Sequence, residues 1–442
     1  MRRRKLTLLP LVAATYFMVS GGPYGLEELV QDCGYRTALL IIILIPLIWS
    51  LPTGLMVGEL AAAMPAEGGF YVWVRRALGP FWGFQEAWLS LMASVFDMAA
   101  YPVLFVLYLG RLWPAANQGY NGMLIGAVVV AACVLWNLGG AKAVGTGSVM
   151  LGILLLSPFV AMVIYALVRH PAFGASAASS APVSTEHGGL LAGIIVAMWN
   201  YMGWDNASTV ATEVENPQRT YPRTMIAALV AIVLSYAIPV AAVWRTHVPP
   251  ADWSTGSWAD IAALIAGPWL GVAMAVAGMI SSLGIINSLT MSYSRLPIAM
   301  AEDGYAPRVL LRRLSNGAPW VAILACGLAW TAALGLSFDR LLMLDILLYG
   351  ASLVLEFIAL AVLRVREPDM VRPFAVPGRL AGAVLAGVGP TALLIVALIR
   401  NRNEQMGHIS ALTLGLGLMA AGVAVWFFAA WSRRRHSTTS GL

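Results

Sequence analysis

Apolar segments of about 20 residues recur along the whole 442-residue chain, and this pattern constrains the fold more than any other feature. A helix needs about 20 consecutive apolar residues to cross the roughly 30 Å hydrocarbon core of a bilayer. Only 11% of the residues are charged, against about a quarter in an ordinary soluble domain. The sequence therefore predicts an all-α integral membrane protein of about twelve transmembrane (TM) helices, at residues 8–32, 38–62, 81–110, 122–141, 147–168, 189–213, 224–245, 265–299, 318–336, 340–363, 380–399 and 410–431.

The basic residues predict how these spans are oriented. Nineteen of the 27 lysines and arginines fall on one side of the membrane if both chain ends lie on that side, and seven fall on the other. Basic loops are retained on the cytoplasmic side, so we expect both termini in the cytoplasm and a location in the cell (inner) membrane. The net charge of +6 is divided among short loops and does not indicate a nucleic-acid partner.

Two of the predicted spans are interrupted by glycine, and carboxylates follow each interruption. The first span contains Ser20, Gly21 and Gly22 ahead of Glu27, and the sixth contains Tyr201, Met202, Gly203 and Trp204 ahead of Asp205. Glycine allows non-helical backbone, which is tolerated inside a membrane where it lines a cavity. Paired interruptions of this kind indicate the substrate site of a transporter built from inverted repeats. The alternative is close helix packing through small residues.

The positions of the two interruptions suggest how the chain is organised. Residues 1–168 are expected to form a first five-helix repeat, and residues 169–188 an outer loop. Residues 189–363 are expected to form a second, inverted five-helix repeat, and residues 364–442 the eleventh and twelfth helices with a cytoplasmic tail. The sequence thus predicts a five-plus-five inverted repeat with broken first and sixth TM helices.

Three of the acidic residues within the predicted spans are further candidates for the site. Asp97 is in the middle of the third span, Asp205 directly follows the second interruption, and Glu356 is in the tenth span. A charge at a helix centre costs roughly 2.5–3.5 kcal/mol to insert, so it normally faces a cavity. Without a deep lysine or arginine to pair with, these carboxylates attract a cation or take up a proton. We expect Asp97 and Asp205 to serve both substrate binding and proton coupling, and Glu356 to line the pathway; a neutral aspartic acid bonded at a kink is the alternative.

Aromatic residues near these acids could hold an ammonium group or an alkyl chain. Trp199 precedes the second interruption, and Tyr101 shares a helix face with Asp97 four residues earlier. Tyr201 and Trp204 lie within the interruption and are included in the candidate substrate site. Glu59, at the inner end of the second span, is expected to form a gate with Arg75 or Arg295.

Enzyme chemistry and bound cofactors are not indicated. The three cysteines are scattered, and all five histidines fall in predicted loops or the tail, so we expect no metal site and no cofactor. No nucleophile and histidine share a predicted span, which disfavours an intramembrane enzyme. A membrane sensor is a further alternative, although no cytoplasmic signalling domain is indicated.

The chain resembles the amino acid–polyamine–organocation superfamily, on motifs spread over residues 15–380. These are Val19-Ser20-Gly21-Gly22-Pro23-Tyr24-Gly25, Gly58-Glu59-Leu60, Pro65-Ala66-Glu67-Gly68-Gly69-Phe70-Tyr71-Val72-Trp73, Leu78-Gly79-Pro80-Phe81-Trp82-Gly83-Phe84-Gln85, Trp204-Asp205 through Glu213-Val214-Glu215-Asn216-Pro217-Gln218, and Ser294-Arg295 through Asp303-Gly304. It is most similar to polyamine uptake transporters and L-type amino acid transporters. The resemblance implies twelve helices, a five-plus-five inverted repeat, and alternating access coupled to protons, sodium or counter-substrate. It also implies that Asp205 holds the position of an acid linked to substrate and proton in related amine carriers.

The resemblance also bears on the substrate. In amino acid carriers of this superfamily the first interruption offers backbone N–H groups to the substrate carboxylate, but Pro23 has no N–H. Proline is also a favoured first residue of a helix, which is the alternative explanation. We therefore expect proton-coupled uptake of polyamines or related organic cations, with an amino acid permease as the alternative. L-type relatives can attach an accessory glycoprotein through an outer-loop cysteine; residues 111–122 contain none, so no disulfide-linked heavy subunit is implied.

Overall fold

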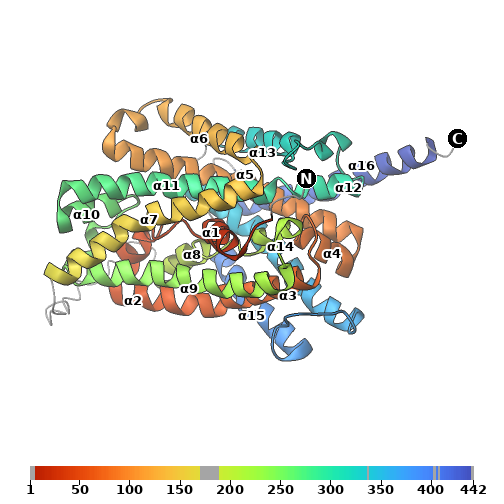
Figure 1. The fold of residues 1–442 in the computed structure, drawn as a ribbon, viewed down its shortest axis with the longest axis horizontal. Coiled ribbons are helices and arrows are strands. Elements are labelled where there is room, and N and C mark those ends of the chain that lie inside the picture. Colours follow the sequence, from red (N-terminus) through yellow and green to blue (C-terminus); the bar gives the residue numbers. More distant parts are fainter. Residues whose placement is uncertain (1–4, 170–188, 336–337, 402–404, 407–408, 440–442) are drawn as a thin grey trace.

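The computed structural model describes residues 5–169, 189–335, 338–401, 405–406 and 409–439. It is a bundle in which most of the long helices run along the longest axis of the molecule (Figure 1). The α-helices are α1 (Leu8–Val19), α2 (Glu27–Ile48), α3 (Ser50–Ala63), α4 (Phe70–Leu78), α5 (Pro80–Leu112), α6 (Asn121–Asn137), α7 (Ala141–Arg169), α8 (Gly189–Trp199), α9 (Pro217–Trp244), α10 (Trp258–Ala266), α11 (Pro268–Tyr293), α12 (Leu296–Glu302), α13 (Trp320–Ala332), α14 (Phe338–Arg366), α15 (Arg379–Asn401) and α16 (Ala411–Thr439). The 3₁₀ helices are η1 (Pro114–Asn117), η3 (Asp205–Thr209), η4 (Ala211–Glu213), η5 (Pro250–Asp252) and η6 (Arg308–Leu311), and the short strands β1 (Gln405–Met406) and β2 (Ile409–Ser410) pair antiparallel.

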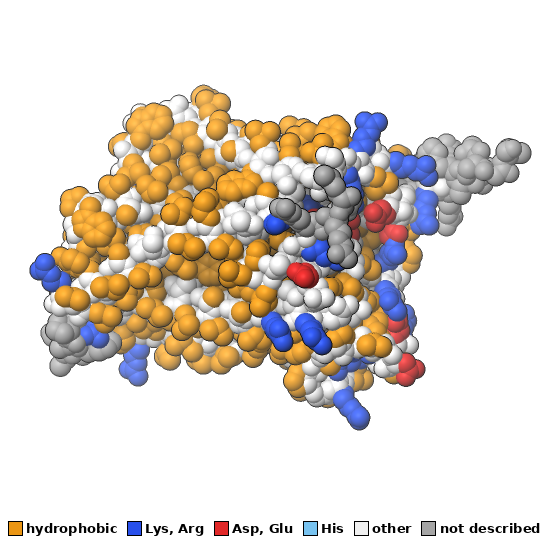
Figure 2. Space-filling model, viewed as in Figure 1, with side chains coloured by type: hydrophobic (Ala, Val, Ile, Leu, Met, Phe, Trp, Pro, Cys, Tyr) orange, Lys and Arg blue, Asp and Glu red, His pale blue; other side chains and the backbone are white. Residues whose placement is uncertain are grey.

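The prediction of a helical membrane protein is confirmed. In the described part of the chain, eight helical stretches are long and apolar enough to cross a membrane, and α1, α6, α8 and α13 are shorter apolar helices. Large apolar side chains cover most of the visible surface, while lysines and arginines gather mainly near the end that holds α4 and α12 (Figures 1 and 2). Soluble proteins rarely expose apolar surface on this scale, whereas lipid tails favour it. The count of twelve crossings and the inverted repeat stay predictions.

Both predicted interruptions are present, and they contact each other. Between α1 and α2 the backbone is non-helical, with a φ of 81° at Gly22; between α8 and η3 the φ of Gly203 is 91°. The Asn200 side chain donates a hydrogen bond to the Gly25 carbonyl (3.1 Å), which ties one interruption to the other. A Cβ atom on Gly203 would lie 2.4 Å from the Met18 carbonyl oxygen, so only glycine allows this approach.

Two local features differ from the expected spans. The first and second spans are joined without a loop, because Gly34 alone turns the chain within α2 with a φ of 70°. After the second interruption the chain forms the 3₁₀ helices η3 and η4, where an α-helical half-span was expected. The expected outer loop at residues 169–188 lies, from residue 170 onward, outside the described residues, and the division into repeats stays a prediction.

Candidate functional site

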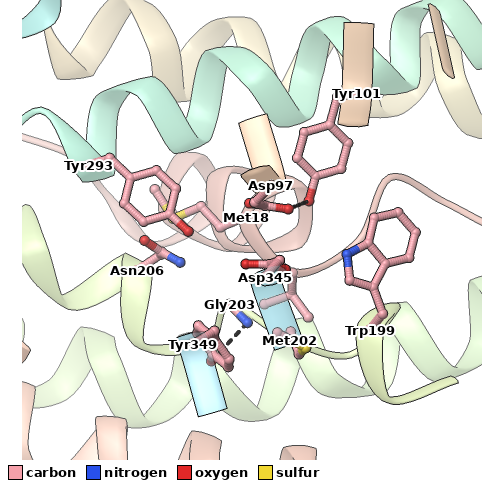
Figure 3. Close-up of a pocket in the computed structure, with 11 residues that line it drawn as sticks. Met18, Asp97, Tyr101, Trp199, Met202, Gly203, Asn206, Tyr293, Asp345 and Tyr349 are labelled. Carbon is pink, nitrogen blue, oxygen red and sulfur yellow. Dashed lines mark hydrogen bonds between the residues drawn. The ribbon is translucent and has the colours of Figure 1, made fainter. Parts of the chain in front are cut away.

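A pocket lies where the two interruptions meet α5, α11 and α14 (Figure 3). The space between its lining atoms, counted together with open solvent, is about 280 Å³. Five of the predicted site residues line it, from three different elements. The lining residues are Met18, Val19, Asp97, Tyr101, Trp199, Met202, Gly203, Asn206, Tyr293, Asp345 and Tyr349.

Two carboxylates from neighbouring helices enter this pocket. Asp97 comes from α5 and Asp345 from α14, and they are close enough to interact electrostatically. The Asp97 carboxylate accepts a hydrogen bond from the Tyr101 hydroxyl (2.5 Å), the residue one helical turn further along α5 (Figure 3). None of the lining residues is a lysine, arginine or histidine. The pocket therefore presents two carboxyl groups without a basic side chain beside them.

Asp205 lies beside the pocket and reaches it through Tyr349. The Tyr349 hydroxyl donates to the Asp205 carboxylate (2.6 Å) and accepts a hydrogen bond from the Gly203 backbone N–H (3.0 Å). This chain of contacts joins the backbone of the second interruption to a buried acid through one pocket residue. A change in the charge of Asp205 would consequently alter a contact of the pocket wall.

Aromatic side chains line the pocket on both sides of the two acids (Figure 3). The rings of Tyr101 and Trp199 stack with their centroids 6.1 Å apart, and Tyr293 lines the same space. Tyr201 and Trp204, which we also expected at the substrate site, do not line this pocket. The Tyr201 hydroxyl donates to the Ile42 carbonyl (2.9 Å), and the Trp204 indole donates to the Tyr201 carbonyl (2.9 Å). Both side chains therefore stabilise the backbone around the interruption and do not face the pocket.

The residues of the first interruption are engaged in contacts within the protein. The Ser20 hydroxyl accepts a hydrogen bond from the Gly22 N–H (3.1 Å), and the Gly21 carbonyl accepts one from Ser281 (2.5 Å). The Glu27 carboxylate accepts bonds from Tyr108 (2.5 Å) and from the backbone N–H of Gly25 (2.6 Å). Ser20, Gly21, Gly22 and Glu27 are therefore not among the pocket-lining residues, although Met18 and Val19 directly before them are.

Two further predicted residues lie closer to the predicted cytoplasmic ends of α3 and α14. Glu356 is fully buried, and neither of its carboxylate oxygens has a hydrogen-bond partner. Glu59 is also fully buried, but it forms ion pairs with Arg364 and Arg372 (3.1 Å) and accepts a hydrogen bond from the Val376 N–H (2.7 Å). The expected Glu59 partners were wrong.

The arginines expected to meet Glu59 are engaged elsewhere. Arg75 pairs with Asp303, and Arg295 pairs with Glu213 (2.8 Å), because these bases lie closer to other loops than to α3. Six acids at this end of the molecule are thus paired with arginines, counting Glu67 (2.7 Å) and Glu302 (3.9 Å), which share Arg313, and the Arg76–Glu367 pair (2.5 Å). The gate role of Glu59 stays a prediction.

Sequence reasoning missed half of the acid pair. Asp345 and Tyr349 stand four residues apart on α14, as Asp97 and Tyr101 do on α5. This repeated spacing places each tyrosine one turn from its aspartate, and it would have identified α14 as the second acid-bearing wall. Asn206 and Tyr293 also line the pocket without having been predicted. The described residues contain no group of three or more His, Cys, Asp or Glu placed to hold a metal ion.

Comparisons with known proteins identify the family of this chain. Residues 12–423 match the family model described as amino acid permease. A polyamine transporter of Arabidopsis thaliana is 34% identical over 94% of this chain and 84% of its own length, and one of Oryza sativa is 34% identical over 95% and 78%. A serine/threonine exchanger of Bacillus subtilis is 25% identical over 86% of both chains. The resemblance stated from the motifs is confirmed: the chain belongs to the amino acid permease family, within the amino acid–polyamine–organocation superfamily, and is a membrane transporter rather than an enzyme.

Proposed function

We propose that this transporter imports polyamines or related organic cations by alternating access, driven by protons, across the cell membrane with both termini in the cytoplasm. The observation that carries the proposal is the pair Asp97 and Asp345 in a pocket whose lining residues include no basic side chain. Buried carboxylates without a cationic partner attract a cation. The polyamine transporters among the relatives support the same substrate class.

The pocket offers complementary groups for both parts of an alkylamine. Each ammonium group can donate a charge-assisted hydrogen bond to a carboxylate, and such bonds are worth roughly 1.5–3 kcal/mol. Asp97 and Asp345 could each hold one ammonium of a diamine, while the stacked Tyr101 and Trp199 rings provide a flat face for the methylene chain. A polyamine therefore matches the pocket better than a solute with one charge.

We assign Asp205 the role of linking the pocket to the second interruption, through the Tyr349 hydroxyl. Neutralisation of Asp205, by a proton or by substitution, would weaken the contact that Tyr349 makes with it and with Gly203. We expect Asp205→Asn to abolish putrescine uptake in proteoliposomes while the protein still elutes as a folded species. Asp252→Asn, an exposed aspartate of η5, is the matched control and should transport normally. Wild-type uptake by Asp205→Asn, with unchanged pH dependence, would refute the assignment.

An amino acid permease is the second candidate, favoured by the family description and by the serine/threonine exchanger among the relatives. An amino acid carboxylate would need free backbone N–H groups at the first interruption. Two of these donors, Gly22 and Gly25, are already bound by the side chains of Ser20 and Glu27. This occupancy supports the amine over the amino acid, and a competition experiment between the two decides it.

A further inference from the structure

A stripe of buried polar side chains runs along α5 from the pocket toward the end that holds α4. Beyond Asp97 it continues through Ser94 and Ser90 to Glu86, at spacings of three, four and four residues. These spacings place all four side chains on one face of the helix. Ser90 donates a hydrogen bond to one Glu86 oxygen (3.0 Å), and the other oxygen has no partner. The stripe therefore ends on a carboxylate that is only half satisfied.

A second stripe on α14 mirrors the first. From Asp345 it passes through Tyr349 and Ser352 to Glu356, all of them buried. Asp345 and Glu356 are eleven residues apart, as Glu86 and Asp97 are, which is about 16 Å along a helix axis. Because α5 and α14 pack together and run in opposite directions, Asp97 faces Asp345 at one level, and Glu86 lies near Glu356 at the other, where Asp205 acts electrostatically on both glutamates.

The lower level, Glu86 and Glu356, is an acid pair without a basic partner. Three of its four oxygens have no hydrogen-bond partner, and both residues are 0% exposed. The charged and titratable groups set against the pair are Asp205 from η3, Tyr71 from α4 and Tyr349 from α14 itself, and none of them is a base.

The other helices packed against this level bring no base to it either. Residues 380–399 of α15 contain no charged residue, and neither do α6, α11 and α13. Glu59 on α3 and Glu302 on α12 lie against arginines, and Arg433 on α16 contacts Tyr305. On α4, Arg75 pairs with Asp303 and Arg76 with Glu367, so within the described residues the acid pair is uncompensated.

The burial of the Glu86 and Glu356 carboxyl groups limits the size of any cation that could bind between them. An exposed fraction of 0% means that no water-sized space touches either carboxyl group. An ammonium group is about as large as a water molecule and has no room there, whereas a proton needs none. Leaving both carboxylates ionised would cost several kcal/mol per ion, so in this conformation the pair must carry protons.

We propose that Glu86 and Glu356 form a proton-binding site, separate from the substrate pocket, for the proton that travels with the amine. This inference rests on the proposed function. An amine and a proton cannot neutralise the same carboxylates together, so sharing Asp97 and Asp345 would produce exchange of one for the other. Cotransport needs two sites that are filled at once. A proton from outer water adds to a carboxylate oxygen of the lower pair, and that O–H bond breaks when cytoplasmic water reaches it.

The test compares three measurements on protein in proteoliposomes, with putrescine as the probe. They are equilibrium binding, putrescine counterflow, and accumulation driven by a pH gradient of one unit with the membrane potential held at zero. With one proton per amine, such a gradient supports about tenfold accumulation of putrescine. A difference of one pH unit is a tenfold ratio of proton concentration, and a tenfold ratio of amine concentration corresponds to the same free energy. We expect Glu356→Gln to bind putrescine within about twofold of wild type and to retain counterflow, while its accumulation falls from about tenfold to none.

Three variants make the result specific. Glu86→Gln should behave like Glu356→Gln, Glu356→Asp should recover part of the accumulation, and Ser352→Ala, which removes a stripe hydroxyl but no acid, should match wild type. If Glu356→Gln does not fold, Glu86→Gln and Glu356→Asp supply the same readouts.

Several outcomes would overturn the inference. Tenfold accumulation by both glutamine variants would remove the lower pair from coupling, and loss of putrescine binding would move it into the substrate site. Wild-type protein that binds putrescine without responding to the gradient would refute proton coupling itself, and absence of putrescine binding would refute the amine substrate. These last two results appear before any substitution is made, so they are distinguishable from failure of the Glu86–Glu356 site.

Discussion

Replacing Gly203 by alanine tests whether the contact between the two interruptions builds the pocket. The new methyl carbon would lie 2.4 Å from the Met18 carbonyl oxygen, at a backbone φ of 91°. The obstacle is a backbone atom of the other interruption, which cannot turn away as a long side chain could. The two segments must therefore move apart, and Met18 and Gly203 both line the pocket.

The magnitude has two contributions. A non-glycine residue at positive φ costs roughly 1–2 kcal/mol, and forcing extra volume into a packed site typically costs about 1–3 kcal/mol more. We expect Gly203→Ala to lower the free energy of unfolding by about 2–5 kcal/mol and to weaken putrescine binding, because the Gly203 N–H would also shift from the Tyr349 hydroxyl.

Two matched variants separate these contributions in thermal unfolding of the purified protein. Gly34 has a φ of 70° and no neighbouring atom within 4 Å of its added methyl, so Gly34→Ala carries only the backbone term. Gly417 lies within α16 and has neither a positive φ nor a neighbour within that distance, so Gly417→Ala should be mildly stabilising. The expected order of melting temperatures is Gly417→Ala, then Gly34→Ala, then Gly203→Ala. Equal stability of the last two, with wild-type putrescine binding, would refute the reasoning.

Three other substitutions have separate expected outcomes. Asp97→Asn should weaken diamine binding about tenfold more than monoamine binding, and an equal loss in titrations would indicate a structural role. Glu59→Gln should lower the free energy of unfolding by about 3 kcal/mol, because Arg364 loses its buried partner; an unchanged melting temperature would contradict this. Arg76 donates to Glu367 and holds the pKa of that carboxyl below its ordinary 4.5, so the pair stabilises the fold above pH 4.5 and loses this effect as the pH falls through the lowered pKa. Arg76→Gln should remove that acid-dependent loss, at most about 1 kcal/mol in pH-dependent melting.

The interruptions could be located from the sequence because glycine within an apolar span is a local signal. Gly22 and Gly203 have positive φ values in the structure, and the carboxylates that follow them are buried. Asp97 and Tyr101 were found for a similar reason, since an acid in the middle of a span must face something polar. These inferences require only the residue and its depth in the membrane.

The direction of a side chain around its helix depends on which helices become neighbours, and the sequence did not provide that. Glu27 and Asp345 are both acids within apolar surroundings, yet Glu27 is bound by Tyr108 while Asp345 enters the pocket. The partners of Glu59 were mistaken for the same reason. Arg364 is more than 300 residues away in the chain, and only the packing of α3 beside α14 brings the two together.

Discrimination against a carboxylate is the prediction that separates the polyamine carrier from the amino acid permease. Three backbone positions of the first interruption have no free N–H group with which to bind a substrate carboxylate. Pro23 has no N–H, the Gly22 N–H is bound by Ser20, and the Gly25 N–H is bound by the carboxylate of Glu27. The protein's own acid thus occupies the end of α2 where a substrate carboxylate would otherwise be stabilised.

A substrate that carries an α-carboxylate must therefore displace an internal hydrogen bond or leave its charge unpaired near Glu27. Losing one charge-assisted bond, roughly 1.5–3 kcal/mol, corresponds to about tenfold or more in affinity. We expect agmatine to bind at least about tenfold more tightly than arginine, and putrescine to exceed ornithine by a similar factor, in titrations of the purified protein. Each pair differs only by the carboxylate, so the other contacts cancel. Arginine that binds as tightly as agmatine would refute the polyamine assignment and favour the amino acid permease.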